Sequence, residues 1–232
     1  MAGQSLERVP FGSTGLMVPP IAVGCAQLGD MPEAFGFGVP EEQAFETIRA
    51  FLNSPLNYID TAALYGDGES ERRIGAVLRQ LGGLPEGAIL ETKVGRNPKN
   101  ADYSGETVKR RFERSLELLG VDKVHVCFLH DAEWTTFEAA MAPGGPVEVL
   151  KRFQEQGAID YLGVASGPVA VELQYIETGI FDAVITHNRF TLLNRSGLPA
   201  HKAAKERGMA VLNAAPYGSC LLYTSPSPRD RG

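Results

Sequence analysis

The chain has 232 residues, of which 44% are hydrophobic and 22% are charged, and its formal net charge is −6. This composition is typical of a soluble globular protein with one large domain. The negative balance, without any Lys/Arg-rich run, argues against nucleic acid or an anionic membrane as a partner, and no apolar stretch is long enough to cross a bilayer.

The N-terminal segment lacks an apolar core, so it does not predict a secretory signal. The three cysteines, Cys25, Cys127 and Cys220, show no C-x-x-C spacing. Because Cys25 and Cys127 lie inside apolar runs, we expect buried free thiols and a reducing, cytoplasmic location. The sequence predicts no metal site.

Short apolar runs alternate with amphipathic runs along the chain. Residues 9–18 predict a β-hairpin, because the turn formers at 12–15 stand between two short apolar arms. Further strands are expected at residues 21–28, 58–62, 88–94, 124–130, 159–165, 183–187 and 209–215. The helices between them are expected at residues 41–53, 69–81, 104–119, 146–156, 168–178 and 199–207.

The predicted helices carry both periodicity and end signals. Phe45, Ile48 and Leu52 recur at helical spacing, so one apolar face of that segment is directed inward. Ser104 is suited to cap the third helix, and Gly120 is suited to end it. These signals separate the helices from the apolar strand runs.

Seven strand–helix steps with near-continuous apolar strands predict a parallel α/β sheet that is buried on both faces. A repeat of ~30 residues, without a Gly-rich dinucleotide fingerprint after the first strand, favours a (β/α)8 TIM barrel over a doubly wound sheet. We expect only seven β/α units here, with the N-terminal hairpin lying as a plug across the barrel floor.

Residues 1–219 are therefore expected to form one incomplete barrel domain that lacks the last strand and helices. Residues 220–232 are Ser/Pro-rich and have no periodicity, so we interpret them as a non-native, disordered tail. A barrel that does not close has two unpaired strand edges, and such edges favour aggregation. We therefore expect this chain to be poorly soluble or weakly active.

Two charged residues stand at the ends of neighbouring predicted strands. Asp60 ends the strand at 58–62, where an isolated Asp would most simply cap the following loop. Lys93 ends the next strand. A lysine that points into a barrel needs a carboxylate partner, because an unpaired buried ammonium is costly. We expect Asp60 to be that partner, which would place both side chains at the barrel mouth.

Tyr65 and His130 extend this arrangement. Alone, a loop tyrosine such as Tyr65 is usually a packing residue, but beside Lys93 its phenol would have a lowered pKa and could exchange a proton. His130 ends the strand after that of Lys93, and strand ends on this rim of a barrel carry chemistry, although a lone histidine there is more often structural. We interpret His125, at the other end of the same strand, as structural.

The segments NYIDTAALYG and LETKVG and the strand-end LH resemble the tetrad segments of the aldo-keto reductase superfamily, in matching order and spacing. YGDGESERRIGAVL, RSLELLGVDKVHVCFLHD and FDAVITHNRFTLL resemble its sugar-oxidising branch, which includes D-threo-aldose (L-fucose) 1-dehydrogenases and pyridoxal dehydrogenases. The resemblance covers residues 6 to 219.

This resemblance implies that Tyr65 is the general acid/base, that Lys93 tunes it, that Asp60 holds Lys93 and that His130 orients the substrate oxygen. It implies an NAD(P)-dependent oxidoreductase that interconverts alcohol and carbonyl groups and oxidises an aldose at its anomeric carbon. Two alternatives stay open: a general aldehyde or pyridoxal oxidoreductase, and a cofactor-binding regulatory subunit with this fold, such as potassium-channel β subunits. The preference between NAD and NADP also stays open.

The resemblance further implies cofactor contacts after the later strands. Ser166 and Asn188 are the candidates for binding the nicotinamide amide. Ala214 occupies the position where many relatives stack an aromatic ring, and Tyr217 follows close by. Trp134 is either a packed residue or a surface on which a sugar stacks. The expected partner is a small sugar or aldehyde, and the expected assembly is a monomer or weak oligomer.

Overall fold

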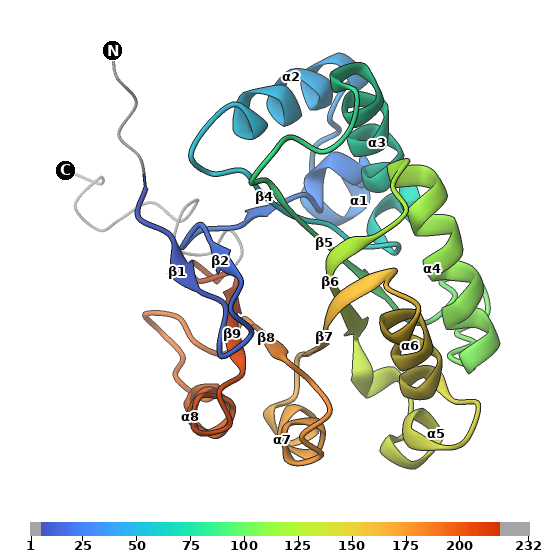
Figure 1. Cartoon of the computed structure of the whole chain (residues 1–232), viewed down its shortest axis with the longest axis vertical. Coiled ribbons are helices and arrows are strands. Elements are labelled where there is room, and N and C mark those ends of the chain that lie inside the picture. The colour runs from blue at the N-terminus through green and yellow to red at the C-terminus, as the bar shows by residue number, and fades with distance from the viewer. Residues whose placement is uncertain (1–5, 219–232) are drawn as a thin grey trace.

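The computed structural model describes residues 6–218. Parallel strands form one curved sheet in chain order: β3 (Val23–Gly24), β4 (Tyr58–Asp60), β5 (Ile89–Val94), β6 (Val124–His130), β7 (Ile159–Ser166), β8 (Ala183–His187) and β9 (Ala210–Ala214). The helical segments are η1 (Gln27–Gly29), α1 (Pro32–Phe35), α2 (Glu41–Leu52), η2 (Tyr65–Gly68), α3 (Glu69–Leu81), α4 (Gly105–Leu119), η3 (Ala132–Trp134), α5 (Phe137–Met141), α6 (Pro146–Glu155), α7 (Val169–Glu177) and α8 (Leu198–Glu206). The longer helices surround the outside of the curved sheet (Figure 1). This arrangement confirms the predicted fold, a TIM-barrel-like sheet of seven strands.

The sheet has two edges within residues 6–218. In that part of the chain β3 pairs only with β4, and β9 pairs only with β8. The expectations for Cys220 and for a non-native tail at 220–232 lie outside the described residues.

An N-terminal hairpin closes one end of the sheet's concave side. β1 (Val9–Pro10) pairs antiparallel with β2 (Met17–Val18). Phe11 is 3% exposed and packs with inward-facing strand residues. The Ser13 amide donates to the Gly208 carbonyl at 2.7 Å, and the Tyr161 hydroxyl donates to the Thr14 carbonyl at 3.1 Å. These contacts confirm the predicted plug across the barrel floor.

Strand residues divide between two apolar clusters because successive side chains point to opposite faces of a sheet. The outward-facing residues pack beneath the helices. The inward-facing cluster contains Phe11, Val18, Tyr58, Ile89, Val126, Phe128, Ala165, Ala183, Ile185 and Ala210. Gly163 also faces inward, where a Cβ atom would lie 2.2 Å from the Phe128 ring. The large Phe128 side chain therefore requires a glycine beside it.

Several segments differ from the sequence predictions, among them the first strand and the loop after His130. The first strand of the sheet is β3, with two residues rather than the eight expected, because the chain turns into η1 at Gln27–Gly29. The loop after His130 contains η3 and α5, which we did not predict. Thr136 begins α5 by accepting a hydrogen bond from the Ala139 amide at 3.1 Å. The predicted cap at Ser104 is confirmed, because its side chain accepts from the Thr107 amide.

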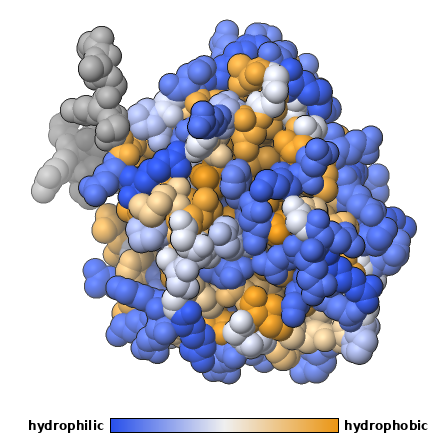
Figure 2. Space-filling model, in the orientation of Figure 1, coloured by the Kyte–Doolittle hydropathy of each residue, from blue (hydrophilic) through white to orange (hydrophobic). Residues whose placement is uncertain are grey.

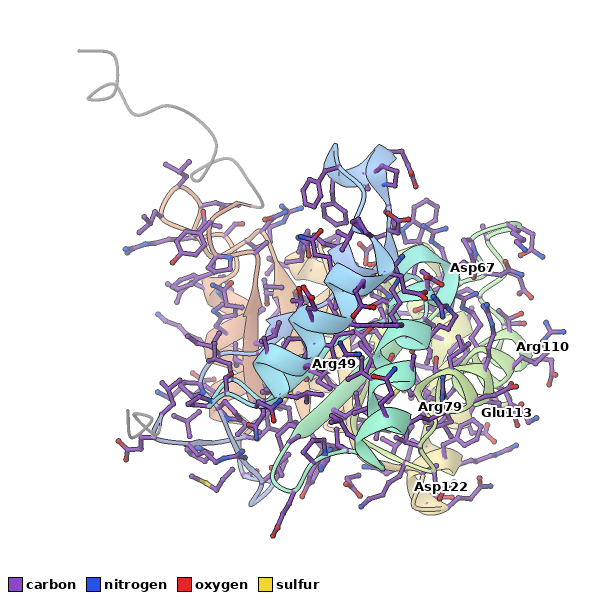
Figure 3. The ribbon with its side chains drawn as sticks, turned by 90° about the horizontal axis from the view of Figure 1, so that it is seen from above. Arg49, Asp67, Arg79, Arg110, Glu113 and Asp122 are labelled. Carbon is purple, nitrogen blue, oxygen red and sulfur yellow. The ribbon has the colours of Figure 1, made fainter. Side chains whose placement is uncertain are left out.

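The outer helices present mainly polar side chains to solvent. In Figure 2 hydrophilic residues cover most of the helical surface on that side, with hydrophobic residues in small patches between them. Figure 3 shows Arg49 on α2, Arg79 on α3 and Glu113 on α4 within this outer layer. No helix among residues 6–218 has the length and apolarity needed to cross a membrane. Cys25 and Cys127 are buried free thiols, as predicted.

Candidate active site

The ion pair between Lys93 and Asp60 lies at the ends of β4 and β5. Lys93 alternates with Ile89, which packs in the inward-facing cluster, so its side chain points into the barrel. That side chain is only 4% exposed. Its Nζ forms the ion pair with Asp60 and also donates to the Thr61 carbonyl at 2.9 Å. The structure thus brings these two predicted residues together as expected.

Lys93 keeps its proton in this setting. Burial lowers the pKa of Lys93, but its acidic neighbours, led by the Asp60 carboxylate, raise it by more, so the pKa lies well above its usual range. Lys93 therefore carries its positive charge at every physiological pH. The rim has a fixed cation beside the Tyr65 hydroxyl.

Tyr65 lies in η2, and its hydroxyl is 3.3 Å from Lys93 Nζ. Backbone contacts fix this loop. Gly66 has a left-handed φ of +61°, and a Cβ on it would lie 2.0 Å from the Gly29 carbonyl oxygen. A Cβ on Gly29 would in turn lie 2.7 Å from the Tyr65 backbone. Only a pair of glycines allows the loop after β3 to approach so closely and hold Tyr65 over Lys93.

Arg111 of α4 anchors the same loop from the outside. Its Nη2 donates to the Ala63 carbonyl at 2.8 Å, and its Nη1 forms an ion pair with Asp67 at 3.3 Å. Asp67 has a left-handed φ of +49°, which few non-glycine residues adopt. The charged contact stabilises that conformation and fixes the turn on which Tyr65 stands.

The expected direction of the Tyr65 pKa was wrong for this structure. Burial raises the pKa of the Tyr65 phenol, and this effect exceeds the lowering by Lys93, while the Asp60 carboxylate raises it further. The net direction is upward. The sequence showed the cation that would stabilise a phenolate, but it could not show that burial outweighs the effect of that cation.

His130 ends β6 with its ring against Tyr65. The two ring centroids are 5.9 Å apart, in an edge-to-face arrangement at 87°. Burial first, and then the charge of Lys93, lowers the pKa of His130 to about 3, so the imidazole is neutral. The Tyr103 hydroxyl donates to the His130 carbonyl and fixes the strand end. At the other end of β6, His125 Nδ1 accepts from the Leu90 amide at 3.2 Å, in agreement with its predicted structural role.

The four predicted cofactor residues lie at or just after the carboxyl ends of β7, β8 and β9. Ser166 is buried, and its hydroxyl donates to Glu133 Oε2 at 2.8 Å. Asn188 follows β8 with a left-handed φ of +57°. Ala214 packs against the inward-facing cluster, while Tyr217 is 64% exposed. The structure therefore brings Ser166, Asn188 and Ala214 to the same rim as the tetrad. The role of each residue stays a prediction.

Trp134 lies in η3, after the end of β6, and is 55% exposed. The Arg96 guanidinium lies 4.1 Å from the Trp134 ring centroid, within range of a cation–π contact. Arg96 follows β5 by two residues, so this contact joins two loops of the same rim. The Trp134 ring thus packs against Arg96 and still exposes more than half of its surface.

Comparison with known proteins identifies the family. Residues 20–230 match the Aldo/keto reductase family. The chain belongs to the aldo/keto reductase family. This family consists of oxidoreductases, so the protein is an enzyme.

Individual aldo/keto reductase relatives extend over most of the chain. An L-galactose dehydrogenase from Arabidopsis thaliana is 27% identical over 227 residues, which cover 96% of this chain and 69% of that protein. A D-threo-aldose 1-dehydrogenase from Pseudomonas sp is 24% identical over 243 residues, covering 94% and 71%. The solved holo form of an aldo-keto reductase from Bacillus halodurans superimposes with a TM-score of 0.76 at 24% identity, covering 96% and 70%. That structural likeness supports the fold.

Sequence reasoning missed His187 of this aldo/keto reductase rim. His187 ends β8 in alternation with Ala183 and Ile185, which both face inward, so its side chain belongs to the mouth. Burial lowers the pKa of His187, and the charges of Asp131 and Lys93 also act on it. The two-residue alternation along β8 identifies His187 only when Ala183 and Ile185 are known to face inward.

Proposed function

We propose that this aldo/keto reductase is an NAD(P)-dependent dehydrogenase that oxidises an aldose at its anomeric carbon, with Tyr65 as the general acid/base. One observation carries the proposal: the Tyr65 hydroxyl lies 3.3 Å from the buried Lys93 ammonium, with the His130 ring against its own. The names of the Arabidopsis and Pseudomonas relatives supply the substrate class, because both are dehydrogenases of aldoses.

The rim of β7–β9 fits a flat cofactor ring. Ala165 and Ala214 supply only methyl groups at the inward-facing ends of β7 and β9, and His187 of β8 stands between them. Ser166 and Asn188 bring polar groups to the same strand ends, where they would hold a nicotinamide amide. When bound there, a nicotinamide supplies the hydride acceptor or donor. All other steps belong to the side chains of this chain.

The proton step belongs to Tyr65. In oxidation its oxygen takes the proton from the anomeric hydroxyl, and in reduction the phenol donates a proton to the carbonyl oxygen. Neutral His130, beside Tyr65, provides a ring nitrogen that hydrogen-bonds the same substrate oxygen and orients it. Because the pKa of Tyr65 is raised by burial, the phenol is the resting form at neutral pH. We therefore expect oxidation to accelerate as pH rises toward the pKa of Tyr65, and reduction to slow as pH rises through it.

The remaining surface of the mouth supports a small polar substrate. The exposed Trp134 ring offers an apolar face on which a pyranose could stack, and the Asp131 carboxylate, 3.6 Å from His130 Nε2, offers a hydrogen-bond acceptor for a sugar hydroxyl. We propose that the protein acts in the cytoplasm as a monomer or weak oligomer on such a free sugar.

The proposal is tested by incubating the purified chain with NAD⁺ or NADP⁺ and a panel of L-galactose, L-fucose, D-arabinose and pyridoxal. We expect reduced nicotinamide to form with an aldose and the product to be the corresponding lactone. An aldose that carries deuterium on its anomeric carbon should transfer that deuterium to the nicotinamide. If the protein turns over only pyridoxal, or only reduces simple aldehydes, the aldose proposal is wrong and the protein is a pyridoxal or general aldehyde oxidoreductase.

A further inference from the structure

A second carboxyl group lies inside the barrel directly beneath the tetrad. Glu91 precedes Lys93 by two residues on β5, so both side chains point inward, and it is the strand partner of Asp60. Glu91 is fully buried. The Tyr58 hydroxyl donates a hydrogen bond to its Oε2, while its Oε1 has no well-aligned hydrogen-bond partner within the described part of the chain.

The charges around Glu91 do not balance if it is ionised. Two carboxyl groups, Asp60 and Glu91, share the single ammonium of Lys93, which is already paired with Asp60. Within the described residues, the titratable side chain that hydrogen-bonds Glu91 is the Tyr58 phenol, and burial raises its pKa. No second cation is therefore available among these neighbours. A buried carboxylate without a cation, beside another carboxylate, is strongly disfavoured.

The neutral acid resolves this imbalance. Burial first, and then repulsion by Asp60, raises the pKa of Glu91 well above its usual range. A protonated carboxyl group has one O–H donor. The Asp60 carboxyl group faces inward beside it, as its register partner on β4. Tyr58 already donates to Glu91, so the only proton that the contact with Asp60 can use is the one on Glu91.

We propose that Glu91 is a protonated carboxylic acid that donates a hydrogen bond to Asp60 and thereby acts as a positioning residue for the chain Asp60–Lys93–Tyr65. The part of the inference that concerns catalysis rests on the proposed function of Tyr65. By drawing negative charge on Asp60 away from Lys93, this hydrogen bond leaves more of the ammonium's field at the Tyr65 hydroxyl. Loss of the donor would weaken that field and raise the pKa of Tyr65.

The protonation state is tested by infrared difference spectroscopy of the full chain against Glu91→Gln. We expect the parent to show the C=O stretch of a buried protonated carboxyl group, and we expect that band to vanish in Glu91→Gln. The band should persist well above neutral pH. If the difference spectrum contains only carboxylate bands, the inference is overturned. This readout requires no turnover, so it stands or fails independently of the proposed function.

The positioning role is tested by the pH profile of kcat for sugar oxidation. Glu91→Gln keeps a neutral hydrogen-bond donor, so we expect the apparent pKa of the profile to stay in place. Glu91→Leu removes the donor, and we expect the apparent pKa to rise by about one unit, which is a tenfold loss of the basic form at a given pH. An apparent pKa that falls in Glu91→Gln would show that a negative charge had been removed, and it would overturn the inference.

Glu71 provides the matched control. It is also buried, but it belongs to α3, which covers the outer face of the sheet, and it accepts from Thr92 Oγ1 at 2.6 Å and Ser115 Oγ at 3.1 Å. Burial raises the pKa of Glu71 to about 7. We expect Glu71→Gln to leave the apparent pKa of the kcat profile in place. If Glu71→Gln and Glu91→Leu shift this pKa equally, the shift comes from general destabilisation and the positioning role of Glu91 is overturned. If Glu91→Leu does not fold, Glu91→Gln and the infrared spectrum decide.

Discussion

Replacing Asp60 by Asn tests the ion pair on which the site depends. The Lys93 side chain is 4% exposed and that of Asp60 is 17% exposed, so the variant takes the ion-pair partner away from a buried ammonium. Removal of one partner from a buried pair costs about 3–5 kcal/mol. Because Lys93 keeps the Thr61 carbonyl at 2.9 Å and the Tyr65 hydroxyl at 3.3 Å, we expect the lower end, about 3 kcal/mol.

The assay is urea unfolding of four chains: the parent, Asp60→Asn, Lys93→Met and the double variant. The double variant removes the unpaired charge, so it should recover most of the stability that Asp60→Asn loses. Asp160→Asn is the matched control, because its pair with Lys123 at 3.2 Å is exposed and should contribute less than about 1 kcal/mol. If Asp60→Asn costs no more than Asp160→Asn, or if the two tetrad substitutions are additive, the reasoning is refuted.

Three further predictions concern other contacts. The pKa of His130 is lowered from 6.5 to about 3, so between these pH values the unfolded chain binds more protons than the folded chain. The free energy of unfolding should therefore fall as pH falls from 6.5 toward 3. His130→Gln should flatten this part of the urea-unfolding pH profile, and an unchanged slope would contradict the prediction. Gly163→Ala should cost about 1–3 kcal/mol because its Cβ meets the Phe128 ring, and Phe128→Leu in the same chain should restore part of that loss. Trp134→Ala should raise KM for the sugar more than it lowers kcat, whereas an unchanged KM would place Trp134 outside the substrate site.

The tetrad could be predicted from sequence because its logic is local. Asp60, Lys93 and His130 each end an apolar run, and parallel strands bring such ends to one rim. The need of an inward lysine for an anionic partner then links Lys93 with Asp60.

The features that the sequence did not predict depend on how deeply a side chain is buried and on which residues of a strand face inward. A glutamate such as Glu91 is usually a solvated residue, and only the fold shows that it is fully buried. His187 needed the phase of β8, which is evident only once Ala183 and Ile185 are seen to face inward. The direction of the Tyr65 pKa needed the degree of burial, which the pattern of residue types does not contain.

The most direct test of the proposed acid/base role is the single-turnover rate of hydride transfer from the aldose to the nicotinamide in Tyr65→Phe. Tyr161→Phe is the matched control, because it removes a tyrosine hydroxyl whose hydrogen bond, to the Thr14 carbonyl at 3.1 Å, lies at the barrel floor. We predict that Tyr65→Phe lowers the rate by about 10²- to 10⁴-fold with nucleotide affinity unchanged, while Tyr161→Phe retains the parental rate. Equal rates in the two variants would contradict the assignment of Tyr65 as the acid/base.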